Sequence, residues 1–181
     1  MTTPPIPRLQ IPSTNFVESC GAVLFDLTSA SKKVCLLHCL ENNEWLLPKG
    51  RRNIREHRSD AATREVTEET GYACHIHPVT MSTRAPAASS DADVKDEART
   101  YPDLTEPFMF MMRPIDGGAS VKIIWWFVAV LDGEEGVERG PGEKAFEAEF
   151  WDCEEAVRKL TFESDREVLE RAIGLMGGAI V

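Results

Sequence analysis

The sequence lacks any apolar run of about 18 residues, the length that a membrane-spanning helix needs. Its first residues, Met-Thr-Thr-Pro-Pro-Ile-Pro-Arg, have no apolar core of the kind found in a secretory signal. Basic residues are few, since 20 Lys and Arg against 30 Asp and Glu give a net charge of −10. Because phosphate contacts need basic patches, this balance argues against a general nucleic-acid binder. We expect no membrane partner, no secretion by that route and no long nucleic-acid partner.

Cysteines with metal-type spacing are also missing. The chain has five cysteines, an odd number, and only Cys35 and Cys39 lie as close as four residues apart. No second Cys or His pair with the spacing of a zinc site follows them. The favoured interpretation is free thiols in a reducing compartment. We therefore expect the protein in the cytoplasm, with the nucleus as the alternative.

Length and composition predict one domain with one hydrophobic core. The chain has 181 residues, of which 43% are apolar, an ordinary fraction for a globular protein. Residues 1–16 are rich in proline and weakly patterned, which predicts a flexible N-terminal arm. Residues 17–181 then form the single domain. The sequence leaves its oligomeric state open.

Apolar periodicity and turn residues predict mixed strands and helices over this domain. One helix begins with Ser59 as its N-cap and ends at Gly71. Two later helices begin with sequences that resemble a capping box, at Asp152 and at Ser164. Strands are expected at 17–27, 33–40, 45–47, 72–79, 106–113, 121–131 and 148–151, and a long loop at 82–104. Many strands with few helices indicate the α+β class.

Three carboxylates on the first helix carry the strongest chemical signal. Glu65, Glu68 and Glu69 are spaced i, i+3 and i+4, which places them on one helix face. Like charges at these spacings repel by a few tenths of a kcal/mol a pair. A hard divalent cation with oxygen ligands, typically Mg²⁺ bridging to substrate phosphates, would offset that repulsion.

The carboxylates belong to a longer motif. Its positions are, in order, Gly50, Glu56, Arg64, Glu65, Glu68, Glu69 and Gly71. Seven fixed positions would match by chance about once in 10⁸ tries. The motif resembles the signature of the Nudix hydrolases, and the resemblance extends upstream over residues 45–50. It implies the α/β/α sandwich of that family, with a mixed sheet, and an enzyme that cleaves a diphosphate linkage.

The resemblance also implies a role for each motif residue. Glu65, Glu69 and the carbonyl of Gly50 are the main metal ligands, for Mg²⁺ or Mn²⁺. Glu68 is either a further ligand or the general base. Some family members take the base from a later loop, where the candidates here are Glu143, Glu147 and Glu149. Glu147 is our first choice because it lies at the mouth of the strand that leads to Trp151.

Glu56, Arg64 and Gly71 are expected to be structural residues of the motif, the first two by holding the loop against the helix. Cations surround them. Six of the 20 basic residues lie within positions 49–64: Lys49, Arg51, Arg52, Arg55, Arg58 and Arg64. An acidic protein that gathers its cations there suits a compact anionic ligand. The expected phosphate contacts are Lys49, Arg51 and Arg52, beside the first metal ligand.

The substrate is less well defined by the sequence. The chain looks like eukaryotic hydrolases of diadenosine polyphosphates or diphosphoinositol polyphosphates, so a small phosphorylated molecule is the expected partner. One alternative is a housecleaning pyrophosphatase of nucleoside triphosphates or nucleotide sugars. Another is a Nudix module that binds a nucleotide or inositol phosphate without cleaving it, although degenerate modules usually lose the carboxylates. Hydrolysis of capped RNA is disfavoured by the net acidity.

Overall fold

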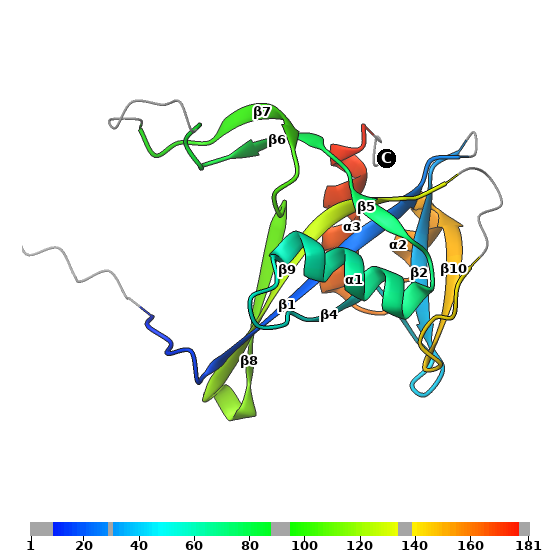
Figure 1. Cartoon of the computed structure of the whole chain (residues 1–181), viewed down its shortest axis with the longest axis horizontal. Helices are drawn as coiled ribbons and strands as arrows, with labels where there is room; N and C mark the ends of the chain where they lie inside the picture. The colour runs from blue at the N-terminus through cyan, green and yellow to red at the C-terminus, as the bar shows by residue number, and fades with distance from the viewer. Residues whose placement is uncertain (1–8, 29–30, 88–94, 134–138, 178–181) are drawn as a thin grey trace, which may run out of the picture.

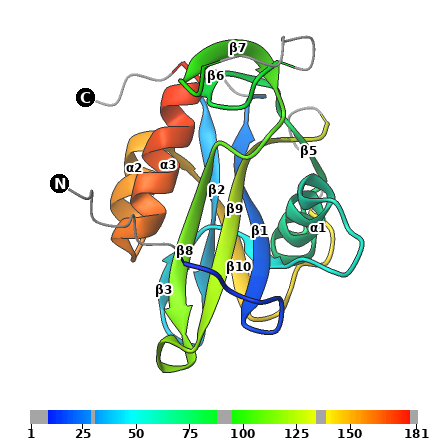
Figure 2. The ribbon, with the colours of Figure 1, turned by 90° about the vertical axis from the view of Figure 1, so that its left-hand side faces the viewer.

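A computed structural model describes residues 9–28, 31–87, 95–133 and 139–177 of this chain. A central sheet lies between α1 (Arg58–Thr70) on one face and the pair α2 (Cys153–Lys159) and α3 (Glu163–Leu175) on the other (Figure 2). The expected α+β class and the α/β/α sandwich with a mixed sheet are confirmed.

The sheet is organised around a long parallel pair. Its strand order is β10-β2-β1-β9-β5, with β3 beside β2, β4 beside β1 and β8 beside β9 (Figure 1). The strands are β1 Phe16–Asp26, β2 Lys33–Cys39, β3 Glu44–Leu46, β4 Lys49–Arg51, β5 Cys74–Ile76, β8 Met109–Ile115, β9 Ser120–Leu131 and β10 Phe146–Asp152. A short 3₁₀ turn, η1 Asp116–Gly118, joins β8 to β9. The β1–β9 pair is parallel, and the other pairs are antiparallel.

The core has two layers because successive side chains of β1 and β9 point to opposite faces of the sheet. On the α1 face, Ala61, Ala62 and Val66 pack against alternate strand residues such as Phe127. These small helix residues let α1 lie close to the sheet. On the other face, Trp126 packs in a cluster with apolar residues of α2 and α3. The apolar run over 121–131 is therefore a central strand, as predicted.

The helices begin at other residues than the capping patterns predict. The N-cap of α1 is His57, whose carbonyl accepts from the amide of Ala61 at 2.9 Å, so the prediction of Ser59 is wrong. The N-cap of α3 is Phe162 rather than Ser164, because the Phe162 carbonyl already accepts from the third residue after it. Asp152 is the N-cap of α2, but its side chain makes no capping bond within the described chain and accepts from Ser31 instead.

The prediction of a long loop at 82–104 is wrong, because both ends of this segment lie in strands. β6 (Val79–Thr83) pairs with β7 (Arg99–Leu104) in a separate two-stranded sheet (Figure 1). The sequence does not predict β7, because this strand contains Pro102 and Asp103 and both residue types are poor strand formers. The strand expected at 72–79 is divided between β5 and β6. The centre of the expected loop, residues 88–94, lies outside the described residues.

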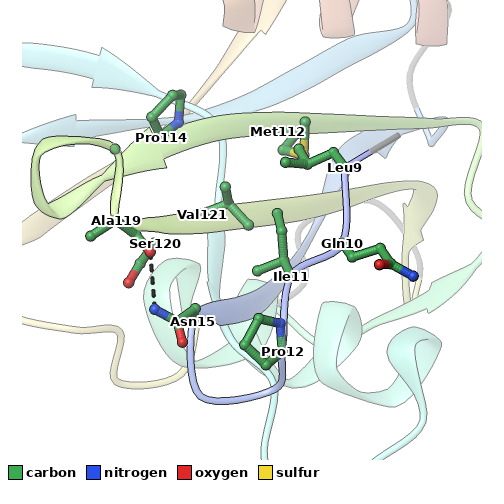
Figure 3. A pocket seen from close by; sticks show the side chains of 11 residues that line it. Leu9, Gln10, Ile11, Pro12, Asn15, Met112, Pro114, Ala119, Ser120 and Val121 are labelled. Carbon is green, nitrogen blue, oxygen red and sulfur yellow. Dashed lines mark hydrogen bonds between the residues drawn. The ribbon is translucent and has the colours of Figure 1, made fainter. Parts of the chain in front are cut away.

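Residues 9–15 of the expected N-terminal arm lie along the end of the β8–β9 hairpin (Figure 3). Asn15 donates through Nδ2 to the Ala119 carbonyl at 3.0 Å and accepts from the Val121 amide at 2.9 Å. Leu9, Ile11 and the hairpin border an open apolar cavity of about 530 Å³. Residues 1–8 lie outside the described residues.

Two further features concern the cysteines and the helices. All five cysteines are free thiols, with Cys20 and Cys35 buried. Within the described residues, no helix has the length and apolarity needed to cross a membrane.

Candidate active site

The motif carboxylates of α1 lie against β4. Glu69 is buried and accepts a hydrogen bond through Oε2 from the backbone amide of Lys49 at 2.8 Å. Gly50 faces Glu65 so closely that a Cβ atom on Gly50 would collide with the Glu65 carboxylate. This close approach requires glycine at position 50, and it brings the β4 backbone into the carboxylate cluster.

Arg64 holds the cluster together. Its Nη1 atom donates to Glu65 Oε1 at 2.7 Å and to Glu68 Oε2 at 2.9 Å. Its Nε and Nη2 atoms make a two-pronged ion pair with Glu56 at 2.7 and 3.0 Å. Nη2 also donates to the Arg51 carbonyl at 3.0 Å. The pair Glu56 and Arg64 thus ties the loop after β4 to α1, in the position that the sequence gives to these two residues.

The environment of two carboxylates disfavours their charged forms. Burial raises the pKa of Glu69 to about 7, and repulsion from Glu65 and Glu143 adds to this, while the Lys49 amide opposes it. Burial also raises the pKa of Glu65, against the lowering effect of Arg64. Glu68, by contrast, is 57% exposed. The cluster therefore holds one solvent-accessible carboxylate, Glu68, beside two whose charged forms are disfavoured by burial.

A loop after β9 covers the C-terminal end of α1. Gly71 ends the helix with φ of +79°, and its carbonyl accepts from the Gly140 amide at 2.8 Å. Arg139 Nε donates to the Thr70 carbonyl at 2.8 Å, and the Glu143 amide donates to the Glu68 carbonyl at 2.9 Å. These bonds satisfy carbonyls that a helix end leaves unpaired. They also place Glu143 at the end of the helix that carries the carboxylates.

Glu147 is not brought to this cluster. It lies on β10 opposite His38, and its Oε2 atom is 4.0 Å from His38 Nδ1. Its neighbours Ala148 and Phe150 pack in the core layer under α1. Because strand residues alternate, Glu147 and Glu149 project toward the opposite face of the sheet.

A NUDIX domain model matches residues 19–172 of the chain. The chain belongs to the NUDIX domain family. With the full set of motif carboxylates in place, it is a Nudix pyrophosphohydrolase. No curated protein matches the chain significantly.

Solved structures with the same fold include an Ap4A hydrolase, a NUDIX domain solved with ADP ribose and a further NUDIX hydrolase. An Ap4A hydrolase from C. elegans has a TM-score of 0.58 and 16% identity over 89% of this chain and 98% of its own. The NUDIX domain of NrtR from Shewanella oneidensis, solved with ADP ribose, has a TM-score of 0.58 and 12% identity, covering 92% and 94%. A NUDIX hydrolase from Nitrosomonas europaea has a TM-score of 0.57 and 14% identity, covering 88% and 90%. At these identities the likeness concerns the fold alone.

The Nudix carboxylates fit a hard divalent cation, the kind of metal that the family generally uses. Among the described residues, no three His, Cys, Asp or Glu side chains are already gathered to hold a metal ion. Arg64 holds Glu65 and Glu68, and the Lys49 amide holds Glu69. The donor set is nevertheless all oxygen, and its mutual repulsion would be relieved by a cation.

The three expected phosphate contacts divide between the two faces of the sheet. Lys49 and Arg51 flank Gly50 on β4, so they point away from α1. Arg52 lies on the α1 side, where its guanidinium contacts Glu18 at 2.8 Å and donates to the carbonyls of Asn53 and Glu56. Arg58 pairs with the same Glu18 at 2.6 Å. Lys49 and Arg51 therefore lie on one face of the sheet, whereas Arg52 lies on the other and holds the loop after β4.

Two cations near the site have no signal in the motif. Lys122 on β9 is half-buried and lies directly opposite Arg113 on β8. Burial lowers the pKa of Lys122, and repulsion from Lys49, Arg113 and Arg51 lowers it further. A lysine within an apolar strand is visible in the sequence, but the strand pairing that places it across β1 from β4 is not.

Proposed function

We propose that this protein hydrolyses a diphosphate linkage in a small phosphorylated molecule with the help of Mg²⁺ or Mn²⁺. Diadenosine polyphosphates and diphosphoinositol polyphosphates are the favoured substrates. One observation carries the proposal: α1 lies against β4 with its carboxylates, Glu69 at the Lys49 amide and Glu65 at Gly50, and β4 also carries the cations Lys49 and Arg51. Carboxylates for a metal and cations for phosphate oxygens are what diphosphate cleavage needs.

The metal ligands in this proposal are Glu65, Glu69 and the Gly50 carbonyl. A divalent cation bound there supplies charge neutralisation and a water of lowered pKa. Release of Glu65 from Arg64 frees its carboxylate, while Arg64 stays anchored by Glu56. Burial raises the pKa values of Glu65 and Glu69, so a cation bound beside them would stabilise their charged forms.

Glu68 is the residue that we assign to the reacting water, as general base or as a ligand of the metal. Its side chain is exposed and held only by Arg64 among the contacts described. Among the carboxylates after β9, Glu143 is better placed to assist the reaction. Its amide donates to the Glu68 carbonyl, and its negative charge adds to the raised pKa of Glu69. Glu147 faces His38, so we give it the lesser role.

Lys49 and Arg51 are the phosphate contacts in this proposal, and Arg52 holds the loop through Glu18. A housecleaning pyrophosphatase of nucleoside triphosphates or nucleotide sugars would use the same carboxylates. The free thiols support a reducing compartment, the cytoplasm or the nucleus.

Product analysis on a substrate panel tests the function. The panel holds diadenosine polyphosphates, diphosphoinositol polyphosphates, ADP-ribose and nucleoside triphosphates, each with Mg²⁺ and with Mg²⁺ plus excess chelator. We expect chelator-sensitive cleavage of the diadenosine or diphosphoinositol class. Cleavage of ADP-ribose or of nucleoside triphosphates alone would favour the housecleaning alternative. Binding of a panel member without cleavage of any would contradict the enzyme and favour a sensor.

A further inference from the structure

Cations from three strands lie in one row next to the carboxylate cluster. On β4, Lys49 pairs with Gly21 of β1, which in turn pairs with Trp126 of β9. Arg51 pairs with Ser19 by the same ladder. On the hairpin β8–β9, Arg113 and Lys122 are direct partners. We refer to Lys49, Arg51, Arg113 and Lys122 as the cation row.

All four side chains project from the sheet face opposite α1. A Cβ atom on Gly21 would lie 2.6 Å from Lys49 Cβ and 2.7 Å from the Trp126 ring, so these groups meet on one side. Trp126 and Ile124 belong to the core layer beneath α3, and strand alternation gives Lys122 the same direction. Met111 packs against that layer too, which gives Arg113 the same direction.

Without a ligand, the cation row destabilises the sheet. Like charges directly opposite each other on antiparallel strands destabilise a sheet, and Arg113 and Lys122 are such a pair. Over the described ranges, none of the four cations has a carboxylate partner at ion-pair distance. The carboxylates that act on Lys49 and Lys122 from further away include the buried Glu69.

Unused polar groups lie on the same face. Ser19 Oγ and Trp126 Nε1 are buried, and neither has a hydrogen-bond partner within the part of the chain that the structure describes. An unsatisfied buried donor is costly to the fold. Both atoms are closed to solvent, so it is the repelling cations that point to an anionic ligand.

The length of the row sets the kind of anion. Lys49 on β4 is level with Trp126 on β9, because both pair with Gly21 of the intervening β1. Lys122 lies four residues before Trp126, so at about 3.3 Å per residue it is offset roughly 13 Å along the strands from the level of Lys49. One phosphate group cannot reach along that distance, whereas a ligand with several phosphate groups can.

We propose that the cation row binds the phosphate groups of the substrate that lie beyond the scissile linkage, and so selects substrates with more than two phosphates. Arg113 and Lys122 are the specificity-determining residues, since they lie farthest from the carboxylates. This inference rests on the proposed function for its link to cleavage. The ligand chemistry is a polyphosphate, whether in a linear chain or on a ring.

Binding of inorganic tripolyphosphate in excess chelator tests the row without any hydrolysis. Calorimetry compares the full-length protein with Lys122→Met and Arg113→Gln, and with Arg158→Ala as a control. Arg158 is an exposed arginine of α2 whose only ion pair is with Glu154 in the described chain. We expect each row variant to raise Kd about tenfold, since a charge-assisted bond is lost. The control should stay within about twofold, and row variants that also stay there would overturn the proposal.

Thermal unfolding separates binding from structure. Lys122→Met relieves the repulsion by Arg113, so the free variant should unfold at the same temperature as the parent or higher. Its upward shift with tripolyphosphate should be smaller than that of the parent. A free variant that is less stable but keeps the full shift would make Lys122 a structural residue and overturn the proposal. Lys122→Arg keeps the charge and should restore binding.

Kinetic measurements on different substrates distinguish a linear polyphosphate chain from phosphate groups on a ring. In Lys122→Met, kcat/KM should fall about tenfold for diadenosine tetraphosphate or for a diphosphoinositol polyphosphate, and less than about twofold for ADP-ribose. An equal fall for all three would contradict selection by phosphate number. If tripolyphosphate binding depends on the row but no substrate is cleaved, the row stands and the proposed hydrolysis fails.

Discussion

Glu143 and Glu147 lie only four residues apart, but they face different parts of the molecule. Glu143 belongs to the loop that covers the end of α1, and its charge adds to the rise in the pKa of Glu69 that burial causes. Glu147 lies beyond that loop, on β10, beside His38. Proximity to the carboxylate cluster therefore favours Glu143 as the loop carboxylate that assists the reaction.

Replacing each of these carboxylates by its amide tests this assignment. Glu143→Gln should lower kcat by about 10²-fold or more, the usual effect of losing a group that assists proton transfer. Glu147→Gln is the matched control and should stay within about threefold of the parent. Steady-state kinetics on the preferred panel substrate gives both values. A larger loss in Glu147→Gln than in Glu143→Gln would restore our first choice from the sequence.

At this scale the sequence predicts the helix residues better than the loop residues. Glu65, Glu68 and Glu69 share a face because helix spacing is regular, and the structure brings them together beside Gly50. Arg52 could not be separated from Lys49 and Arg51 in the same way. Arg52 lies directly after β4, where its backbone amide bonds the Glu18 carbonyl and its guanidinium pairs with the Glu18 carboxylate.

At the scale of elements, the end of α1 and the loop at 139–143 depend on each other. Gly71 has a positive φ, and the loop packs so close that a Cβ atom there would collide with the Gly140 carbonyl. Arg139 and the amide of Glu143 cap the helix from the same loop. A change at Gly71 should therefore disturb both the helix end and the loop.

Gly71→Ala should lower the free energy of unfolding by about 1–3 kcal/mol, because alanine is strained in the left-handed region and meets backbone there. Gly174→Ala is the matched control on α3, where an added Cβ meets nothing within 4 Å. Alanine in that helix should instead raise the free energy of unfolding by about 0.4–1 kcal/mol. Urea unfolding measures both variants. Equal stability of Gly71→Ala and the parent would contradict the close packing of the loop.

Elements with strong patterns were predicted well, and elements without them were not. The central strand β9 follows from its continuous apolar run, and α1 ends at Gly71 as expected. The hairpin of β6 and β7 was missed because Pro102 and Asp103 make β7 look like loop. The predicted caps at Ser59 and Ser164 were wrong because the N-cap of each helix lies two residues earlier, at a residue whose backbone carbonyl accepts the first helical hydrogen bond.

At the scale of the molecule, the mixed sheet joins segments that are distant in the sequence. The parallel pairing of β1 with β9 and the antiparallel pairing of β1 with β4 set Lys122 and Arg51 on either side of β1, on one face of the sheet. Such register is decided by tertiary packing, which a single sequence does not reveal. The Nudix motif predicted the fold and the carboxylate cluster, whereas the cation row required the structure.

The most direct test of the account is the turnover of Glu68→Gln on the preferred panel substrate at saturating Mg²⁺. The side chain is 57% exposed, so the variant should fold like the parent. We predict a loss of about 10²–10⁴-fold in kcat, with tripolyphosphate binding retained. Glu155→Gln, on the exposed side of α2, is the control and should keep full activity. Near-parent turnover by Glu68→Gln would contradict the assignment of catalysis to the α1 carboxylates.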